Sequence, residues 1–236
     1  MHRRYTLGGN IIIMKALFIN ASPRKNWNTH KMLESCMKGA GDSGAETKLI
    51  HLYDYNFKGC VSCFACKLKN AKTQGLCAYR DDLRPLLDEA LNSDIVVIGS
   101  PVYFSYPTGM MRSFLERFLF PIMSYSLDEN GKKLSAIDRK IYSAVIYTMN
   151  CPEDLAAKIH YPEYLEPNAS AMQIVLGYCE TLCAYNTYQF TNYDRYEANV
   201  FSESEKAQQR EKIFPEDLKK AYELGARLVR KANNHD

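Results

Sequence analysis

The sequence predicts a three-layer α/β protein built on a doubly wound, five-stranded parallel sheet of strand order 2-1-3-4-5. Two observations lead to this fold class. Apolar blocks with strand character alternate along the chain with blocks of helical periodicity, which is typical of a parallel sheet covered by helices on both faces. The length of 236 residues suits one domain of this kind.

Five segments have strand character. The clearest is residues 95–98, an uninterrupted β-branched run that ends at Gly99, as expected for a strand buried on both faces. The other predicted strands are residues 16–20, 47–52, 141–147 and 188–191.

Helices are predicted where apolar positions recur every three or four residues. The first helix begins at Thr29 and breaks at Gly41, and the second begins at Leu83, where Asp81 and Asp82 can cap it. Three further helices are predicted. One begins at Gly109, one lies within residues 163–183, and the last starts near Pro215. Residues 120–138 are predicted to form a loop with a turn at residues 128–131.

Composition narrows the classes of partner. The net charge is +3 with 24% charged residues, so charge supports neither nucleic acid nor an anionic membrane as a partner. No apolar run approaches the roughly 20 residues of a membrane helix, and the N-terminal residues lack the apolar region and small-residue cleavage site of a signal peptide. We therefore expect a cytoplasmic protein that acts on small molecules.

Met14 is a plausible start of the protein, and the predicted domain boundary is placed there. Residues 1–13 are interpreted as an N-terminal extension, in which residues 11–13 could lengthen the first strand. Residues 14–236 are interpreted as a single domain that carries a cysteine-bearing loop at residues 59–80.

Two loops at the predicted switch point of the sheet are chemically unusual. The first, residues 20–29, presents hydroxyl, amide and guanidinium groups before a helix N-terminus, which suits a phosphate dianion, although an ordinary helix cap would use the same residues. The second, residues 99–109, places aromatic residues between prolines at a strand end, where a planar ring system could lie.

These loops resemble those of the NADPH-dependent FMN reductase and flavodoxin-like oxidoreductase family, near its iron-sulfur flavoprotein branch. The motifs are Ser22-Pro23-Arg24 with Asn28-Thr29, the cysteine stretch ending before Asp81-Asp82, and Gly99-Ser100-Pro101-Val102-Tyr103 followed by Gly109-Met110-Met111-Arg112. The resemblance covers roughly residues 15–119. It implies a flavodoxin-like fold, bound FMN, and NADH or NADPH as a co-substrate.

The resemblance also implies which residues hold the flavin. Phosphate contacts would come from Ser22, Arg24, Asn28 and Thr29; ring contacts from Pro101, Val102, Tyr103 and Phe104; and a third set, after the fourth strand, from Thr148, Met149 and Asn150. The sequence departs from the family at Ala21 and Trp27, where glycine is common. Because glycine readily takes a positive φ and tryptophan does not, Trp27 puts the geometry of the loop in question.

The cysteine-bearing loop contains Cys60, Cys63, Cys66 and Cys77. Three thiolates at this spacing can reach one metal centre, as in compact ferredoxin-type runs, so a 4Fe–4S cluster is one interpretation. The iron-sulfur branch usually places its fourth cysteine closer to the third. Structural zinc is a second interpretation, although zinc sites usually present two separated pairs. Free thiols are a third, and the one that the spacing favours.

Three functions remain open. An enzyme would use FMN to pass electrons from a nicotinamide to a quinone, free flavin or other small acceptor, and needs no acid or base from the protein. A carrier would relay electrons between protein partners, with or without a cluster. A flavin-free interaction domain is the third. We also expect a homodimer or higher oligomer, with the apolar segment 114–123 and the tyrosine-rich second half as surface.

Overall fold

The computed structural model describes residues 5–7, 10–71, 73, 75–127, 129–131 and 133–234, with the backbone alone for residues 5–7, 10–12, 133 and 134. Its main sheet contains five parallel strands in the order β10-β9-β5-β3-β4. Read from the other edge, this is the predicted order 2-1-3-4-5. The strands are β3 (Lys15–Asn20), β4 (Glu46–His51), β5 (Ile95–Tyr103), β9 (Ile141–Thr148) and β10 (Gly177–Ala184).

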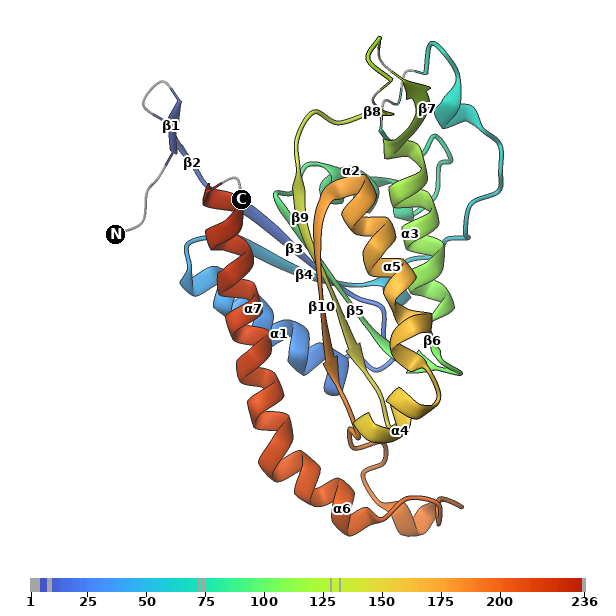
Figure 1. Ribbon diagram of the computed structural model, residues 1–236, viewed down its shortest axis with the longest axis vertical. Coiled ribbons are helices and arrows are strands. Elements are labelled where there is room, and N and C mark those ends of the chain that lie inside the picture. The colour runs from blue at the N-terminus through green and yellow to red at the C-terminus, as the bar shows by residue number, and fades with distance from the viewer. Residues whose placement is uncertain are drawn as a thin grey trace.

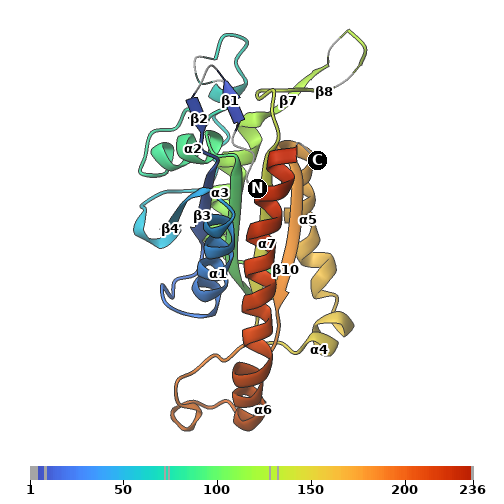
Figure 2. The same ribbon diagram turned by 90° about the vertical axis from the view of Figure 1, so that its left-hand side faces the viewer.

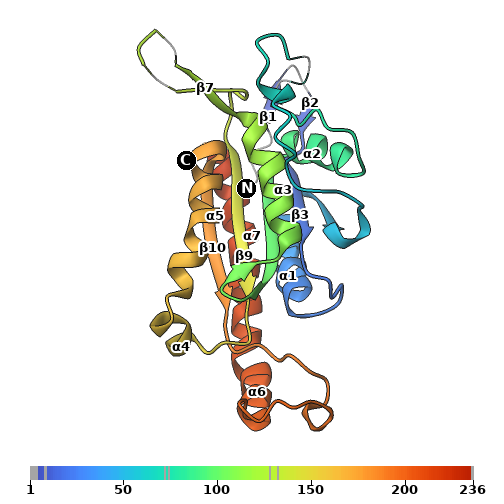
Figure 3. The ribbon, with the colours of Figure 1, turned by 90° about the vertical axis from the view of Figure 1, so that its right-hand side faces the viewer.

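Helices cover both faces of the sheet (Figure 1). One layer contains α1 (Asn28–Asp42) and α7 (Phe214–Asn234), which face the viewer in Figure 2. The opposite layer contains α2 (Leu83–Leu91), α3 (Gly109–Ile122) and α5 (Tyr161–Leu176), of which α3 and α5 are in front in Figure 3. The apolar stripes of the helices pack against the sheet in two separate clusters, one in each layer.

Shorter elements complete the described chain. They are β1 (Tyr5–Leu7), β2 (Asn10–Ile12), β6 (Tyr106–Pro107), β7 (Met123–Leu127), β8 (Lys133–Ser135), α4 (Glu153–Lys158), α6 (Glu203–Gln208), the 3-10 turns η1 (Leu52–Asp54), η2 (Ala65–Lys67) and η3 (Tyr193–Arg195), and the π-helical turn η4 (Gln209–Ile213). None of the described helices combines the length and the apolar character needed to cross a membrane.

The predicted fifth strand was misplaced. Residues 188–191 lie in a loop, and the edge strand is β10, which pairs with β9 in parallel. This edge strand contains Glu180 and two cysteines and is only partly buried, so it lacks the apolar run that marks the central strands. The helix predicted within residues 163–183 is α5, and it ends where Gly177 takes a left-handed φ of +96°.

Two smaller expectations were also wrong. Residues 11–13 do not lengthen the first strand, because β2 pairs with β1 in an antiparallel hairpin before β3 begins. Residues 120–138 are not all loop, because β7 and β8 form a hairpin. Of the predicted turn at residues 128–131, Gly131 has a φ of +77°, and Asp128 lies outside the described residues, as do residues 1–4, 8 and 9.

The apolar segment 114–123 is not free to form a dimer surface. Phe114, Leu115, Phe118 and Ile122 are all at most 3% exposed in the core between α3 and the sheet. Their helical periodicity already accounts for their burial within one chain. The expectation of an oligomer therefore loses this part of its basis.

Candidate functional site

The loops after the two central strands meet at the carboxyl end of the sheet. Asn20, the last residue of β3, is paired with Gly99 of β5. One residue further on, the Ala21 N–H donates to the Gly99 carbonyl at 2.8 Å, and the Thr108 hydroxyl donates to the Ala21 carbonyl at 2.9 Å. The two loops predicted to grip one ligand are thus hydrogen-bonded to each other at the switch point of the sheet.

The loop after β9 joins them. The hydroxyl oxygens of Thr29, at the start of α1, and Thr148, the last residue of β9, lie 2.7 Å apart, and both residues are buried. The loops after β3, β5 and β9 therefore converge at this edge of the sheet, although the first and the last of them are more than a hundred residues apart in the sequence.

The first loop is held in shape by its own polar groups. The Ser22 N–H donates to the Asn20 side-chain oxygen at 2.9 Å, and the Arg24 N–H donates to the Ser22 hydroxyl oxygen at 3.1 Å. Ser22 is 3% exposed. These contacts are side-chain turns of the kind that aspartate, asparagine and serine form, and they lead the chain into α1.

A distant segment covers this loop. The side chains of Trp27 and Asn28 both donate to the Tyr188 carbonyl, at 3.1 and 2.8 Å, and Arg24 donates to the Gln189 carbonyl at 2.6 Å. Trp27 has a φ of −112°, so the loop needs no left-handed residue where the family commonly has glycine. The indole instead fastens residues 188–189 over the loop.

The aromatic loop after β5 is a tight hairpin. Val102 and Tyr103 pair with β6, and the two turn residues Phe104 and Ser105 have left-handed φ values of +48° and +71°. Such backbone is costly for residues other than glycine and is found where the surrounding structure enforces it. Pro101 and Val102 are half-buried and Tyr103 is exposed, while the Phe104 side chain is 96% exposed.

The third loop carries a buried acceptor. Among the described residues, the Asn150 side-chain oxygen is buried without a hydrogen-bond partner. The Asn150 carbonyl accepts a hydrogen bond from the Lys206 ammonium at 2.5 Å. Burial lowers the pKa of Lys206 to about 8. An unpaired acceptor at this edge can receive an N–H from a ligand.

Tyr53 is a site residue that the sequence analysis did not identify. It lies in η1, which follows β4 at the same edge of the sheet as the other loops. Burial and the neighbouring Tyr103 raise the pKa of its phenol, while a hydrogen bond with Thr108 lowers it. Its position directly after a strand of the sheet was the available signal.

The four cysteines of residues 59–80 line one hollow, together with Glu116 and Arg117 of α3. We call it the cysteine hollow. Cys60 and Cys63 are exposed, Cys66 is half-buried and Cys77 is buried, and none of them forms a disulfide. Burial raises the pKa of the Cys66 thiol. Across the described chain, no three histidine, cysteine or acidic side chains are already placed to hold a metal ion.

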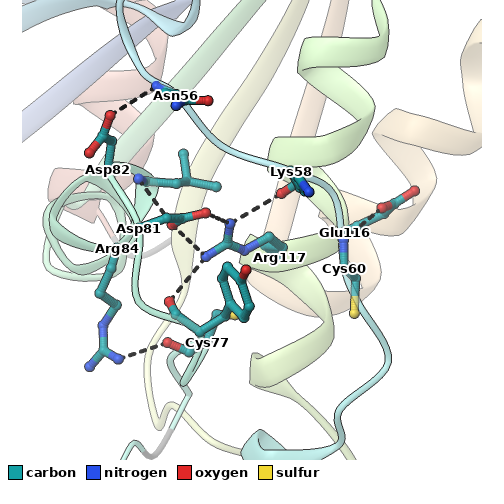
Figure 4. Close-up of polar contacts among 11 residues, drawn as sticks. Asn56, Lys58, Cys60, Cys77, Asp81, Asp82, Arg84, Glu116 and Arg117 are labelled. Atoms are coloured by element: carbon teal, nitrogen blue, oxygen red, sulfur yellow. Dashed lines mark hydrogen bonds and ion pairs between the residues drawn. The ribbon is translucent and has the colours of Figure 1, made fainter.

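Arg117 anchors both ends of the cysteine loop (Figure 4). Its guanidinium donates to the Lys58 carbonyl at 3.1 Å, ahead of the first cysteine, and to the Tyr79 carbonyl at 3.2 Å, after the last. It also forms a two-pronged ion pair with Asp81, at 2.5 and 2.9 Å. This pair was not predicted, since Asp81 and Asp82 were expected to cap α2. Asp81 does accept the Leu83 N–H, but the Asp82 carboxylate accepts from the Asn56 N–H instead.

Residues 14–147 match the family described as NADPH-dependent FMN reductase. The chain belongs to this family. Two relatives from Archaeoglobus fulgidus, each named iron-sulfur flavoprotein, are 31% identical over 55% of this chain and 68% of the relative, and 37% identical over 45% and 46%. An NAD(P)H:quinone oxidoreductase from Methanothermobacter marburgensis has the same fold, with a TM-score of 0.64 and 15% identity over 92% of this chain and all of that one.

Membership of this family makes the protein an oxidoreductase of the FMN reductase type. The flavodoxin-like fold inferred from the sequence is confirmed by the sheet order and by the solved structure just described.

Proposed function

We propose that the loops after β3, β5 and β9 bind one FMN, and that the protein uses it to oxidise NADH or NADPH and reduce a small acceptor such as a quinone or a free flavin. The observation that carries this proposal is the hydrogen-bonded convergence of Ala21, Gly99, Thr108, Thr29 and Thr148 at the switch point of the sheet. Ligands of doubly wound sheets bind at this point.

The phosphate belongs at the first loop. Ser22, Arg24, Asn28 and Thr29 present hydroxyl, guanidinium and amide donors at the N-terminus of α1, where backbone N–H groups and the helix dipole favour an anion. Arg24 and Asn28 already direct their donors toward carbonyl oxygens of residues 188–189. A phosphate would offer these two side chains a charged acceptor in place of a neutral one.

The ring system belongs between the second and third loops. Pro101, Val102 and Tyr103 offer an apolar and aromatic wall, and the buried Asn150 oxygen offers an acceptor for a ring N–H. Tyr53 closes the edge near Thr108. Bound FMN supplies the hydride and electron chemistry, while these residues orient the ring and exclude water from it.

The cysteine hollow favours a second candidate, an iron-sulfur flavoprotein that relays electrons to a protein partner. Four thiols line this hollow, which is the donor set that a 4Fe–4S cluster requires. Zinc suits the spacing less well, because the cysteines do not form two separated pairs. The relatives named iron-sulfur flavoprotein support this candidate.

For an oligomer, we propose a contact surface other than the segment 114–123. Leu155, Ile159, Tyr164 and Ile174, on and between α4 and α5, are 40–74% exposed. A mass measured by light scattering that equals one chain would contradict it.

Two measurements test the proposed function. Protein purified without oxygen should contain about one FMN per chain and should oxidise NADPH with a quinone as acceptor. Absence of turnover with either nicotinamide and with several small acceptors would leave the carrier as the better account.

For the cluster, we expect about four iron and four sulfide per chain. Cys63→Ser should lose this iron, while Cys179→Ser, a half-buried cysteine on β10, should retain it.

A further inference from the structure

Arg117 has one donor more than its partners use. A guanidinium carries five N–H groups, two on each terminal nitrogen and one on Nε. The terminal nitrogens have four acceptors, namely the two Asp81 oxygens and the carbonyls of Lys58 and Tyr79. Among the described residues, Nε is buried without a partner.

An unpaired donor of this kind is unusual. Arg117 is 2% exposed, so water does not replace the missing acceptor at its surface. Buried N–H groups nearly always have a partner, because an unpaired one has lost its hydration and gained nothing in return. The Nε–H group is therefore a donor for which the described residues supply no acceptor at hydrogen-bond geometry.

The position of Arg117 indicates where this acceptor lies. Its side chain lines the cysteine hollow together with all four cysteines of the loop. Cys77, the buried member of the four, is also the cysteine whose side chain interacts with the Arg117 guanidinium. A thiolate or sulfide in this hollow would be an acceptor for a charge-assisted hydrogen bond.

We propose that the Arg117 Nε–H donates to a sulfur of the metal cluster, on the side of the hollow where Cys77 is the ligand. This inference rests on the proposed cluster. Arg117 is then a positioning residue, because it fixes both ends of the cysteine loop at Lys58 and Tyr79 and also contacts the occupant of the hollow. Hydrogen bonds to cluster sulfurs stabilise the more negative, reduced form and so raise the reduction potential.

The ion pair with Asp81 makes it possible to separate the effect of this hydrogen bond on the reduction potential from the effect of charge. The Asp81 carboxylate already neutralises the guanidinium. Replacing Arg117 with a neutral residue would leave Asp81 as an unpaired negative charge and would lower the potential through charge alone. Arg117→Lys keeps the charge of the pair while removing the Nε donor and the planar fork. It is therefore the variant that reports on the hydrogen bond.

The chain offers a matched control in Arg84. This half-buried arginine of α2 donates to the Cys77 backbone carbonyl at 2.8 Å and does not line the hollow. Full-length wild-type protein, Arg117→Lys and Arg84→Lys would be reconstituted anaerobically with ferrous iron and sulfide. Iron, sulfide and FMN content would be measured first, followed by the midpoint potential of the cluster in a titration monitored by electron paramagnetic resonance.

We expect wild type and Arg84→Lys to share one potential, and Arg117→Lys to have a lower potential at equal FMN content. Equal iron content and equal potential in all three proteins would overturn the role of Arg117. Wild-type protein that binds FMN and oxidises NADPH but takes up no iron would overturn the cluster proposal and this inference with it. A cluster in a wild type that fails to bind FMN would instead contradict the proposed flavin site.

A second measurement does not depend on the folding of Arg117→Lys. Wild-type protein labelled with ¹⁵N-arginine would be reduced and studied by electron-nuclear double resonance. A ¹⁵N coupling to the cluster that persists in Arg84→Lys is the expected result. Absence of any ¹⁵N coupling in the loaded wild type would contradict the hydrogen bond, whatever the behaviour of Arg117→Lys.

Discussion

The hydroxyl oxygens of Thr29 and Thr148 lie 2.7 Å apart, although 119 positions separate them in the sequence. Thr29 is the second residue of α1, the helix that follows the first loop, and Thr148 ends the fourth strand of the main sheet. This one hydrogen bond therefore links the proposed phosphate end of the flavin site to the loop that carries Asn150.

Removing either hydroxyl should loosen this link. In Thr29→Val or Thr148→Val, the remaining hydroxyl stays buried without a partner, so each substitution should lower the free energy of unfolding by about 1–2 kcal/mol. The double variant should cost less than the sum of the two, because no hydroxyl is then left unpaired. Urea unfolding of the four proteins measures the coupling. Additive losses would contradict the pairing of these two residues.

The phosphate role of Arg24 can be separated from the rest of the flavin site. Arg24→Gln should weaken FMN binding by about tenfold, since a charge-assisted hydrogen bond contributes about 1.5–3 kcal/mol. It should leave the affinity for riboflavin, which lacks the phosphate, unchanged. Arg195→Gln, at an exposed arginine of η3, serves as the control. If Arg24→Gln weakened the binding of FMN and of riboflavin equally, the role of Arg24 would be limited to holding the covering segment at residues 188–189.

Alanine substitutions at two glycines of α1 that lie two positions apart should differ in their effect on stability, because only one of these glycines packs against α7. A Cβ on Gly39 would lie 1.9 Å from the Tyr222 carbonyl oxygen of α7, whereas a Cβ on Gly41 would meet only Thr47 at 3.8 Å. Gly39→Ala should therefore destabilise the protein by about 1–3 kcal/mol. Gly41→Ala should be neutral or stabilise it by up to about 1 kcal/mol. Thermal unfolding compares the two, and equal melting temperatures would contradict the close packing of these helices.

The buried Lys206 should make stability depend on pH. Its pKa is lowered from 10.5 to about 8, so between these values the unfolded chain binds a proton that the folded chain has released. Stability must therefore rise with pH across this window. Relative to Lys206→Met, the wild type should gain unfolding free energy between about pH 8 and pH 10 in urea titrations. A difference that stays constant over this range would show that Lys206 titrates normally.

The central strands and the site loops could be predicted because their signals are local. The run 95–98 is buried on both faces and is therefore continuously apolar, and the three loops follow strand ends. The edge strand at Gly177–Ala184 was missed because its outer positions are half exposed and polar. Residues 188–191 contain aromatic side chains, which mimic a strand, but their carbonyls are used to cover the loop at Trp27.

The pairing of Asp81 with Arg117 could not be predicted for a different reason. Both residues fit local patterns, Asp81 as a helix cap and Arg117 as one position of an amphipathic helix. Only the packing of α3 beside the cysteine loop brings the guanidinium to Asp81 and to the Lys58 carbonyl. A contact of this kind depends on tertiary structure and leaves no periodic trace in the sequence.

The central claim is that three loops at the carboxyl end of the sheet hold FMN by its phosphate and its ring. Titration of flavin-free protein with FMN and with riboflavin, followed by flavin fluorescence, tests it most directly. We expect one FMN to bind per chain, with an affinity at least tenfold higher than that of riboflavin, because the phosphate adds charge-assisted contacts. Equal affinity for the two flavins, or no binding of either, would contradict this claim.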